Sequence, residues 1–139
     1  METTMSPVAF AEAQREVELA VRELYDAWTV RDADRLRQSF TTTDGLAVWG
    51  TDAWEKIYGR HEADRDFAGW IATCPPWTSI EPLHRSIGGN AGIVWVADEL
   101  EGRWASPTMQ GIARLRFTTI WERSEGRWLV VHAHLAEPR

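Results

Sequence analysis

The spacing of the apolar residues changes at a pair of prolines, Pro75-Pro76, and this change most constrains the fold. Before the prolines, apolar residues recur every three or four positions, which is typical of amphipathic helices. After them, apolar and polar residues alternate, as they do in strands with one buried face. Two consecutive prolines end a helix firmly. Helices followed by an antiparallel meander predict an α+β fold, in which a curved antiparallel sheet wraps over the N-terminal helices.

Three helical segments are predicted before the prolines. The first runs from Phe10 to Arg31, with Val17, Val21, Leu24 and Trp28 on its apolar face. Asp32 and Asp34 are suited to cap a shorter second helix, which carries Leu36 and Phe40. A turn at "TTTDG" then leads into a short strand over Leu46 to Gly50. The third helix follows Gly59 and places Phe67, Trp70, Ile71 and Cys74 on one face.

Four long strands are predicted after the prolines, separated by the turn sequences "GGN", "SP" and "SEG". Their ranges are Trp77 to Ile87, Ile93 to Trp104, Met109 to Arg123 and Arg127 to Ala136. A chain of 139 residues suits one domain with a real hydrophobic core. We therefore expect a single domain over residues 1–139, with its core within about 10–138.

Charge and composition argue against several classes of partner. The net charge of −6 is unsuited to nucleic acid, since phosphate binding needs a basic patch. No apolar run approaches the roughly 20 residues of a membrane span. The single cysteine, Cys74, excludes an internal disulfide and fits a reducing compartment, and the first residues, "METTMSPVA", do not resemble a signal peptide. We expect a cytoplasmic protein with neither a nucleic-acid nor a membrane partner.

Aromatic residues are concentrated in "LAVWGTDAWEKIYGR", residues 46–60, which contains Trp49, Trp54 and Tyr58. The whole chain has nine tryptophans, more than its core requires. A large ring is costly to expose without a purpose, so this stretch lines a core, a ligand pocket or a partner surface. The polar Gly-Thr-Asp between the rings favours the wall of a pocket.

Two parts of the sequence resemble a known family. The first helix, then "DADRLRQSF", then a strand leading into "GTD" and "YGR", resembles the start of SnoaL-like domains. These domains belong to the superfamily of nuclear transport factor two and ketosteroid isomerase. The closing "FTTIWERSEGRWLVVHAHLAEP" resembles the last hairpin of this group, and it is also similar to the association domain of calcium/calmodulin-dependent kinase. The resemblance covers roughly Val17 to Pro138. It implies a cone-shaped, cystatin-like fold with a pocket between sheet and helices, and pairing of two chains through the sheet.

The resemblance also allows a test for ketosteroid isomerase chemistry, which uses a carboxylate base, a tyrosine and a protonated aspartate. The base position falls at about Trp49, and the aspartate position near Thr118. The tyrosine position falls near Leu24, one place before Tyr25. An indole cannot remove a proton from carbon, and a threonine is a weaker donor than a carboxylic acid. The sequence therefore predicts that this catalytic set is absent.

The strand "GIVWVADELEG" has two alternating faces. Alignment with the kinase association domain places Ile93, Trp95, Ala97 and Glu99 on the inward face. That family has a pocket arginine where this chain has Ala97, so its anion site is not implied here. Glu99 would then be the inward carboxylate and a candidate general base, unless it lies in solvent at the strand end. Arg116 on the next strand is expected to pair with Glu99 or to bind a substrate carboxylate.

On the last strand Trp128, Val130, His132 and His134 share one face. Since the opposite, aliphatic face suits the helices, the sequence predicts Trp128, His132 and His134 in the interface of a homodimer. Two histidines at positions i and i+2 can also bind a metal, but a third ligand with suitable spacing is missing. We expect no metal and no cofactor.

Two classes of function remain open. The first is a pocket protein that binds a small apolar or aromatic ligand. The second is an enzyme of cyclase, isomerase or hydratase type that acts on a polyketide, terpenoid or steroid-like ring compound. Weak catalytic candidates for that enzyme are Glu99, Tyr25 and Thr118. The candidate ligand-binding residues are Trp28, Trp49, Trp54, Tyr58, Trp95, Glu99, Arg116 and Thr118.

Overall fold

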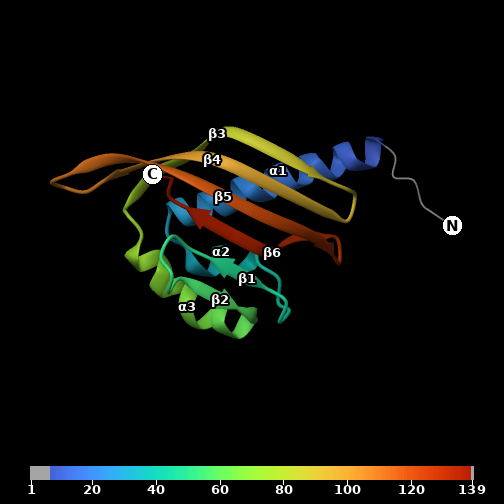
Figure 1. The fold of residues 1–139 in the computed structure, drawn as a ribbon, viewed down its shortest axis with the longest axis horizontal. Helices are drawn as coiled ribbons and strands as arrows, with labels where there is room; N and C mark the ends of the chain where they lie inside the picture. The colour runs from blue at the N-terminus through green and yellow to red at the C-terminus, as the bar shows by residue number, and fades with distance from the viewer. Residues whose placement is uncertain (1–6, 139) are drawn as a thin grey trace.

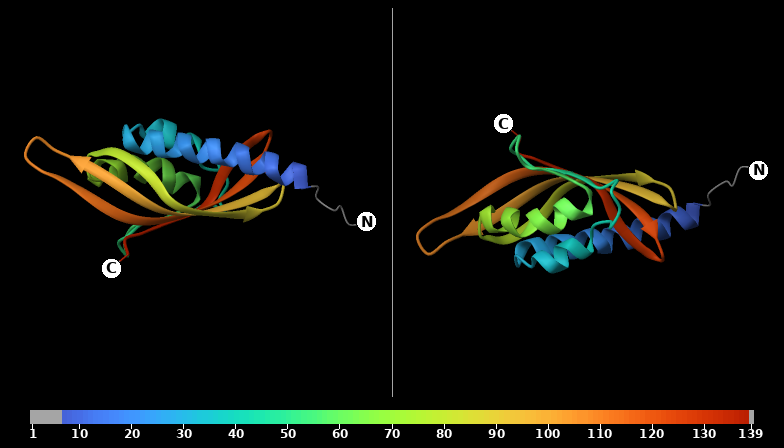
Figure 2. Two further views of the ribbon diagram at one scale, coloured as in Figure 1. Left: turned by 90° about the horizontal axis from the view of Figure 1, so that it is seen from above. Right: turned by 90° about the horizontal axis from the view of Figure 1, so that it is seen from below.

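A computed structural model describes residues 7–138, and it confirms the predicted α+β fold (Figure 1). One six-stranded sheet has the strand order β2-β1-β6-β5-β4-β3. The sheet curves around the helices, and α1 runs lengthwise over its inner face (Figure 2). The helices are α1 (Pro7–Thr29), α2 (Ala33–Gln38) and α3 (Gly59–Thr73). The strands are β1 (Ala47–Trp49), β2 (Lys56–Tyr58), β3 (Trp77–Gly89), β4 (Ile93–Ala105), β5 (Gln110–Ser124) and β6 (Arg127–Ala136).

Helix α1 supplies the largest helical surface of the core. Its predicted apolar stripe is buried, with Val17, Val21 and Leu24 almost fully removed from solvent. The helix ends at Thr29, and Arg31 then adopts a left-handed backbone with φ of 60°, which turns the chain toward α2. Within residues 7–138, no helix combines the length and apolar character needed to cross a membrane.

Helix α2 begins as predicted and ends earlier than predicted. The Asp32 carboxylate accepts a hydrogen bond from the backbone N–H of Arg35 at 3.1 Å, which caps the helix. The helix stops at Gln38, so the prediction that Phe40 lies within it was wrong. Phe40 instead forms an isolated parallel bridge with Val130, because the chain has already turned to run beside β6.

The short strands β1 and β2 form one edge of the sheet. β1 pairs in parallel with β6 and antiparallel with β2, a three-residue strand that the sequence pattern did not predict. Gly59 has a φ of 82°, which a residue with a side chain rarely adopts, and α3 begins there. Helix α3 ends at Thr73, just before Cys74 and the proline pair.

The four long strands lie within two residues of their predicted bounds. β3, β4, β5 and β6 pair successively in antiparallel register. The β4–β5 hairpin projects beyond the helices at one end of the molecule (Figure 1). The core therefore lies between the inner face of this sheet and the three helices.

The face of β4 that points inward is the opposite of the predicted one. Val94, Val96 and Leu100 are buried, and so is Asp98, whereas Ile93 and Trp95 are 46% and 40% exposed. The prediction that Ile93, Trp95, Ala97 and Glu99 face inward was wrong, because the aliphatic residues of the other face pack beneath the helices.

Strand β6 changes its inward face part-way along, because it contains a β-bulge. Trp121 pairs with Val130 and Ile120 pairs with His132, so Val131 is an extra residue. Trp128 lies before the bulge and is buried, and its indole Nε1–H donates to Glu16 Oε2 on α1 at 2.8 Å. The prediction that Trp128 shares the convex face with the histidines was therefore wrong. His132 and His134 lie after the bulge, on the outer face beside β1.

Candidate functional site

A cavity of about 80 Å³ lies between the C-terminal half of α1, helix α3 and strands β1, β5 and β6. Its walls are almost entirely apolar, and Glu55 is the one charged side chain among the described lining residues. Leucine, isoleucine and valine side chains complete the walls. The aromatic residues that line the cavity are Trp28, Phe40, Trp49, Phe67, Trp70 and Phe117.

The wall formed by α1 and β5 is rigidly packed. Trp28 is 7% exposed, and its ring centroid lies 5.7 Å from that of Phe117. Behind Trp28, the ring of Trp77 makes an edge contact at 6.2 Å. Contacts of this geometry add to the stability gained from burial alone. This wall is therefore fixed by the hydrophobic core.

Helix α3 forms the opposite wall through Phe67, Trp70 and Ile71, whose spacing of three and four residues places them on one face. Phe67 packs against Phe40 with centroids 4.8 Å apart and against Trp70 at 6.4 Å. Trp70 is only half-buried. The α3 wall thus runs from the closed end of the cavity to its solvent-exposed mouth.

The loop between β1 and β2 borders the mouth and is closed upon itself. The Gly50 N–H donates to the backbone carbonyl of Glu55 at 2.8 Å. The Glu55 side-chain Oε1 accepts hydrogen bonds from Thr51 Oγ1 at 3.1 Å and from the Asp52 N–H at 2.9 Å. A Cβ atom at position 50 would lie 2.7 Å from the Glu55 Cβ, so a glycine is needed there. Glu55 is therefore held in one place at the cavity.

Cys74 lines the cavity at the end of α3. Burial raises the pKa of its thiol, and a hydrogen bond from Trp28 opposes this by lowering it. The nearby Glu55 charge also raises the pKa of Cys74, while Arg31 lowers it. The net shift is upward, so Cys74 is an ordinary thiol rather than an activated nucleophile.

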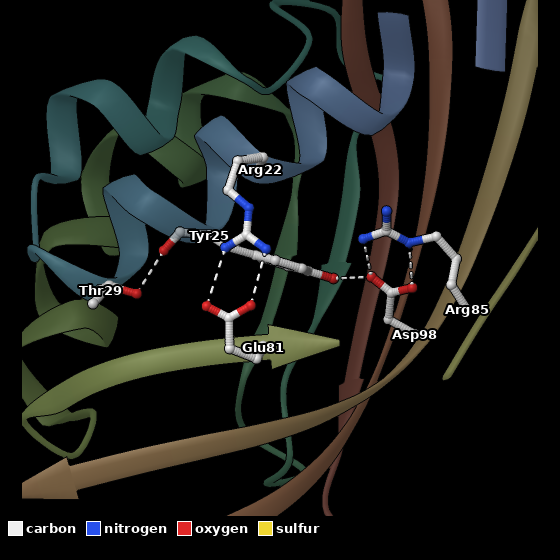
Figure 3. Close-up of polar contacts among 6 residues, drawn as sticks. All are labelled: Arg22, Tyr25, Thr29, Glu81, Arg85 and Asp98. Carbon is white, nitrogen blue, oxygen red and sulfur yellow. Dashed lines mark hydrogen bonds and ion pairs between the residues drawn. The ribbon is translucent and has the colours of Figure 1, made fainter. Parts of the chain in front are cut away.

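A buried polar network lies beside the cavity, where Asp98 accepts hydrogen bonds from two side chains (Figure 3). Tyr25 Oη donates to Asp98 Oδ2 at 2.5 Å, and Arg85 binds both carboxylate oxygens, at 2.8 and 2.9 Å. The Asp98 side chain is 0% exposed. Burial and the adjacent Asp98 charge raise the pKa of Tyr25, and the hydrogen bond to Asp98 raises the pKa of Arg85.

This network fastens α1 to the sheet. Both Asp98 oxygens are occupied, so the carboxylate is not available as a base. The Phe117 ring lies between the network and the cavity, with its centroid 6.1 Å from Tyr25 and 5.7 Å from Trp28. An ion pair between Arg22 and Glu81, at 3.1 Å, adds a second link from α1 to β3 (Figure 3).

The structure brings only some of the predicted site residues together. Trp28 and Trp49 line the cavity. The other six ligand-binding candidates do not: Trp54, Tyr58, Trp95, Glu99, Arg116 and Thr118.

The three catalytic candidates are also separated. Glu99 is exposed and pairs with Arg116 at 3.8 Å, the pairing alternative that the sequence left open. Thr118 sits on the same outer face as Glu99, and Tyr25 is buried on the inner one.

An aromatic cluster occupies the outer face of the sheet near β1. The Trp49 ring makes edge contacts with His132 and His134, at centroid distances of 5.1 and 5.6 Å. Its Nε1–H donates to Tyr58 Oη at 3.2 Å, and His132 Nδ1 lies 3.0 Å from the Ala47 carbonyl oxygen. Trp49 is therefore both a lining residue of the cavity and a member of this outer cluster.

Sequence reasoning missed Glu55, Trp70 and the Asp98 network. Trp70 was placed on the correct helix face but not at a cavity. Tyr25 follows Val21 by four residues on the apolar stripe of α1, and a buried hydroxyl needs a partner. That signal could have led to Asp98. No comparable signal marks Glu55, whose position depends on the closure of its loop.

Several solved structures share this fold. An NTF2-like superfamily protein from Salmonella enterica aligns with a TM-score of 0.76 at 10% identity, covering 93% of this chain and 93% of that chain. A proposed calcium/calmodulin-dependent protein kinase II association domain from Xanthomonas campestris aligns with a TM-score of 0.75 at 13% identity, covering 89% and 86%. A proposed dehydratase of the NTF2-like family from Streptomyces avermitilis has a TM-score of 0.72 at 15% identity, covering 92% and 97%. At such identities the likeness shows the fold.

The sequence itself identifies the family. No curated protein matches the chain significantly. The profile of the SnoaL-like domain family matches residues 17–138, which include α2, α3, all six strands and most of α1. This confirms the resemblance that the N-terminal part of the chain and the closing hairpin indicated. The chain belongs to the SnoaL-like domain family.

Proposed function

We propose that this protein binds a small apolar or aromatic ligand in the cavity between α1, α3 and the sheet. The observation that carries the proposal is the wall of six aromatic residues around one charged group. Ligand sites in proteins commonly combine such apolar walls with a few polar groups that fix orientation. Among residues 7–138, Asp98 is the one buried carboxylate, and its own partners already saturate it.

The volume limits the size of the ligand. Pockets for drug-sized molecules measure about 300–1,000 Å³, and a cavity of about 150 Å³ can hold benzene. At about 80 Å³, this cavity suits a ligand with a single ring, part of which protrudes through the mouth. Glu55, Trp70 and Cys74 line the cavity and are only half-buried, so a ligand can enter from solvent beside them.

Binding without ketosteroid isomerase chemistry is consistent with the residues present. The resemblance puts the base of that catalytic set at about Trp49, and Thr118 lies on the outer face of the sheet. The proposed function is therefore recognition of a ligand by a pocket protein.

Calorimetric titration with benzyl alcohol tests this proposal. We expect saturable binding with one site per chain. Because Cys74 is the single cysteine and lines the cavity, methylthiolation of its thiol should fill the cavity and abolish binding. The Cys74→Ser variant, treated with the same reagent, should still bind and serves as the control. Absence of saturable binding by benzyl alcohol, or binding that survives methylthiolation, would refute the proposed site.

The alternative function is an enzyme on a ring compound, of cyclase, isomerase or hydratase type. The likeness to the proposed dehydratase from Streptomyces avermitilis favours it, as does a carboxylate at an apolar cavity, which can act as an acid or base. Glu55 would then take the role that the sequence suggested for Glu99. Incubation with hydroxylated ring compounds, followed by chromatography and mass spectrometry, separates the two functions. Recovery of every compound unchanged supports binding alone, and loss of water from one of them supports the enzyme.

A further inference from the structure

The cavity contains an uncompensated negative charge. Glu55 makes no ion pair with any of the described residues, and its Oε2 has no hydrogen-bond partner among them. Its other oxygen, Oε1, is held by Thr51 and Asp52. Oε2 is not closed off from solvent, so a donor or a cation that enters at the mouth of the cavity can reach it.

The aromatic residues that line the same cavity favour the same kind of ligand. Tryptophan and phenylalanine faces attract cations, and cages of aromatic rings bind ammonium groups. Trp28 and Trp70, two of the aromatic residues that line the cavity, carry indoles, which attract cations most strongly. One carboxylate and these aromatic residues suit a ligand that carries a single positive charge on an apolar body.

From this arrangement we propose that the ligand is a small organic monocation, an apolar amine or ammonium compound, whose charged group meets Glu55 at the mouth of the cavity. This inference rests on the proposed function, since it names the class of ligand for the same site. The apolar body of the ligand lies against Trp28, Phe67 and Phe117. Its ammonium group donates hydrogen bonds to the free Oε2.

The loop is built to hold the carboxylate before a ligand arrives. Gly50 allows the Glu55 side chain to lie directly over the backbone, with Oε2 2.9 Å from where a Cβ would be. The hydrogen bonds from Thr51 and Asp52 fix the orientation of the carboxylate. The Glu55 side chain therefore loses little conformational entropy when a ligand binds. More of its attraction for a cation then appears as binding affinity.

Three probes of nearly equal shape test this inference by calorimetry at neutral pH. They are benzylamine, which is a cation, benzyl alcohol, which is neutral, and benzoate, which is an anion. For the wild-type protein we expect benzylamine to bind at least about tenfold tighter than benzyl alcohol, and benzoate not to bind measurably.

Two variants locate the source of the preference. Glu55→Gln keeps an oxygen that can accept from Thr51 and Asp52 but removes the charge, so benzylamine should lose its advantage while benzyl alcohol still binds. Asp44→Asn removes an equal charge from an exposed side chain in the turn before β1 and should keep the preference. Retained benzyl alcohol binding also shows that the cavity of the variant is intact.

The outcomes separate the two proposals. Equal binding of benzylamine and benzyl alcohol by the wild-type protein would overturn the cation inference and leave the proposed pocket in place. A preference for benzylamine that survives in Glu55→Gln would overturn it as well. If no probe binds the wild-type protein, the proposed function itself fails, and the inference fails with it.

Discussion

Asp98 is buried, although a carboxylate ordinarily lies in water. Its carboxylate is fully removed from solvent, and three charge-assisted hydrogen bonds from Tyr25 and Arg85 replace the lost water. Its neighbour Glu99 lies on the opposite face of the same strand and pairs with Arg116 in solvent. Two adjacent carboxylates thus have different roles, because the side chains of a strand alternate between its two faces.

Replacement of these two residues should have unequal effects. Asp98→Ala leaves Tyr25 and Arg85 without their acceptor, and the free energy of unfolding should fall by about 3 kcal/mol. Glu99→Ala breaks an exposed ion pair, which is worth about 0–1 kcal/mol. Urea denaturation of both variants measures the difference. Equal losses would contradict the burial of Asp98 described here.

Tyr25 should make the protein sensitive to alkali. Its folded-state pKa is raised above the ordinary value of about 10, so above pH 10 the unfolded chain releases a proton that the folded chain keeps. The stability from this group is therefore complete below pH 10 and decreases as pH rises further.

The matching variant is Tyr25→Phe, which lacks the proton. Between pH 9 and 11 the wild-type free energy of unfolding should fall by about 1 kcal/mol more than that of the variant. Urea denaturation at several pH values gives both slopes. Parallel slopes would show that Tyr25 is not shielded as its contacts indicate.

At the scale of elements, helix α3 and strand β5 carry tryptophans in different surroundings. Trp70 on α3 is half-buried at the cavity, whereas Trp121 on β5 is 0% exposed and donates to Thr119 Oγ1 at 2.7 Å. Trp121→Ala should therefore cost about 3–5 kcal/mol of stability. Trp70→Ala should cost clearly less and should weaken the binding of an aromatic probe, because its ring already borders a void. Thermal unfolding and probe titration of Trp70→Ala decide this. A loss as large as that of Trp121→Ala, with probe binding unchanged, would place Trp70 in the core.

Most elements could be predicted from local pattern. The stripe of α1, the Asp32 cap of α2 and the four alternating strands depend on near neighbours in the sequence. The bulge in β6 could not be predicted, because it is defined by pairing with β5 rather than by residues near Val131. It moves Trp128 and His132 to opposite faces, although they are an even number of residues apart. The three-residue strand β2 is likewise too short to show a pattern.

The candidate site was predicted only in part, for a related reason. Both faces of β4 carry apolar residues, so the alternation alone did not show which one lies under the helices. The alignment with the kinase association domain pointed to the wrong face, and Tyr25, the partner of Asp98, is 73 residues away in the sequence. Glu55 depends on a turn closed by Gly50. Trp28 and Trp49 could be predicted because a large ring is costly to expose and is therefore usually found in a core, a pocket or an interface.

At the scale of the whole molecule, the outer face of the sheet exposes large rings, among them Trp49 and Trp95. We propose that two copies of the chain pair there, as expected from the sequence. The aromatic cluster of Trp49, Tyr58, His132 and His134 supports this, together with the exposed Trp95. Such an interface should bury at least roughly 1,200 Å² in total.

Light scattering at micromolar concentration should therefore give the mass of a dimer. Trp95→Glu places a charge on the outer face and should give a monomer. Leu19→Glu changes a residue of α1 that is 74% exposed, away from the sheet, and should leave the dimer intact. A wild-type monomer would refute pairing through this face.

The central claim is that the cavity between α1, α3 and the sheet is a ligand site, and the reactivity of Cys74 tests it most directly. The rate of Cys74 modification by a small thiol reagent can be followed at increasing concentrations of benzylamine. If the ligand occupies the cavity, the rate should fall to a low plateau, with half of the effect at the dissociation constant found by calorimetry. A rate that stays constant while calorimetry shows saturation would place the ligand elsewhere and contradict the account.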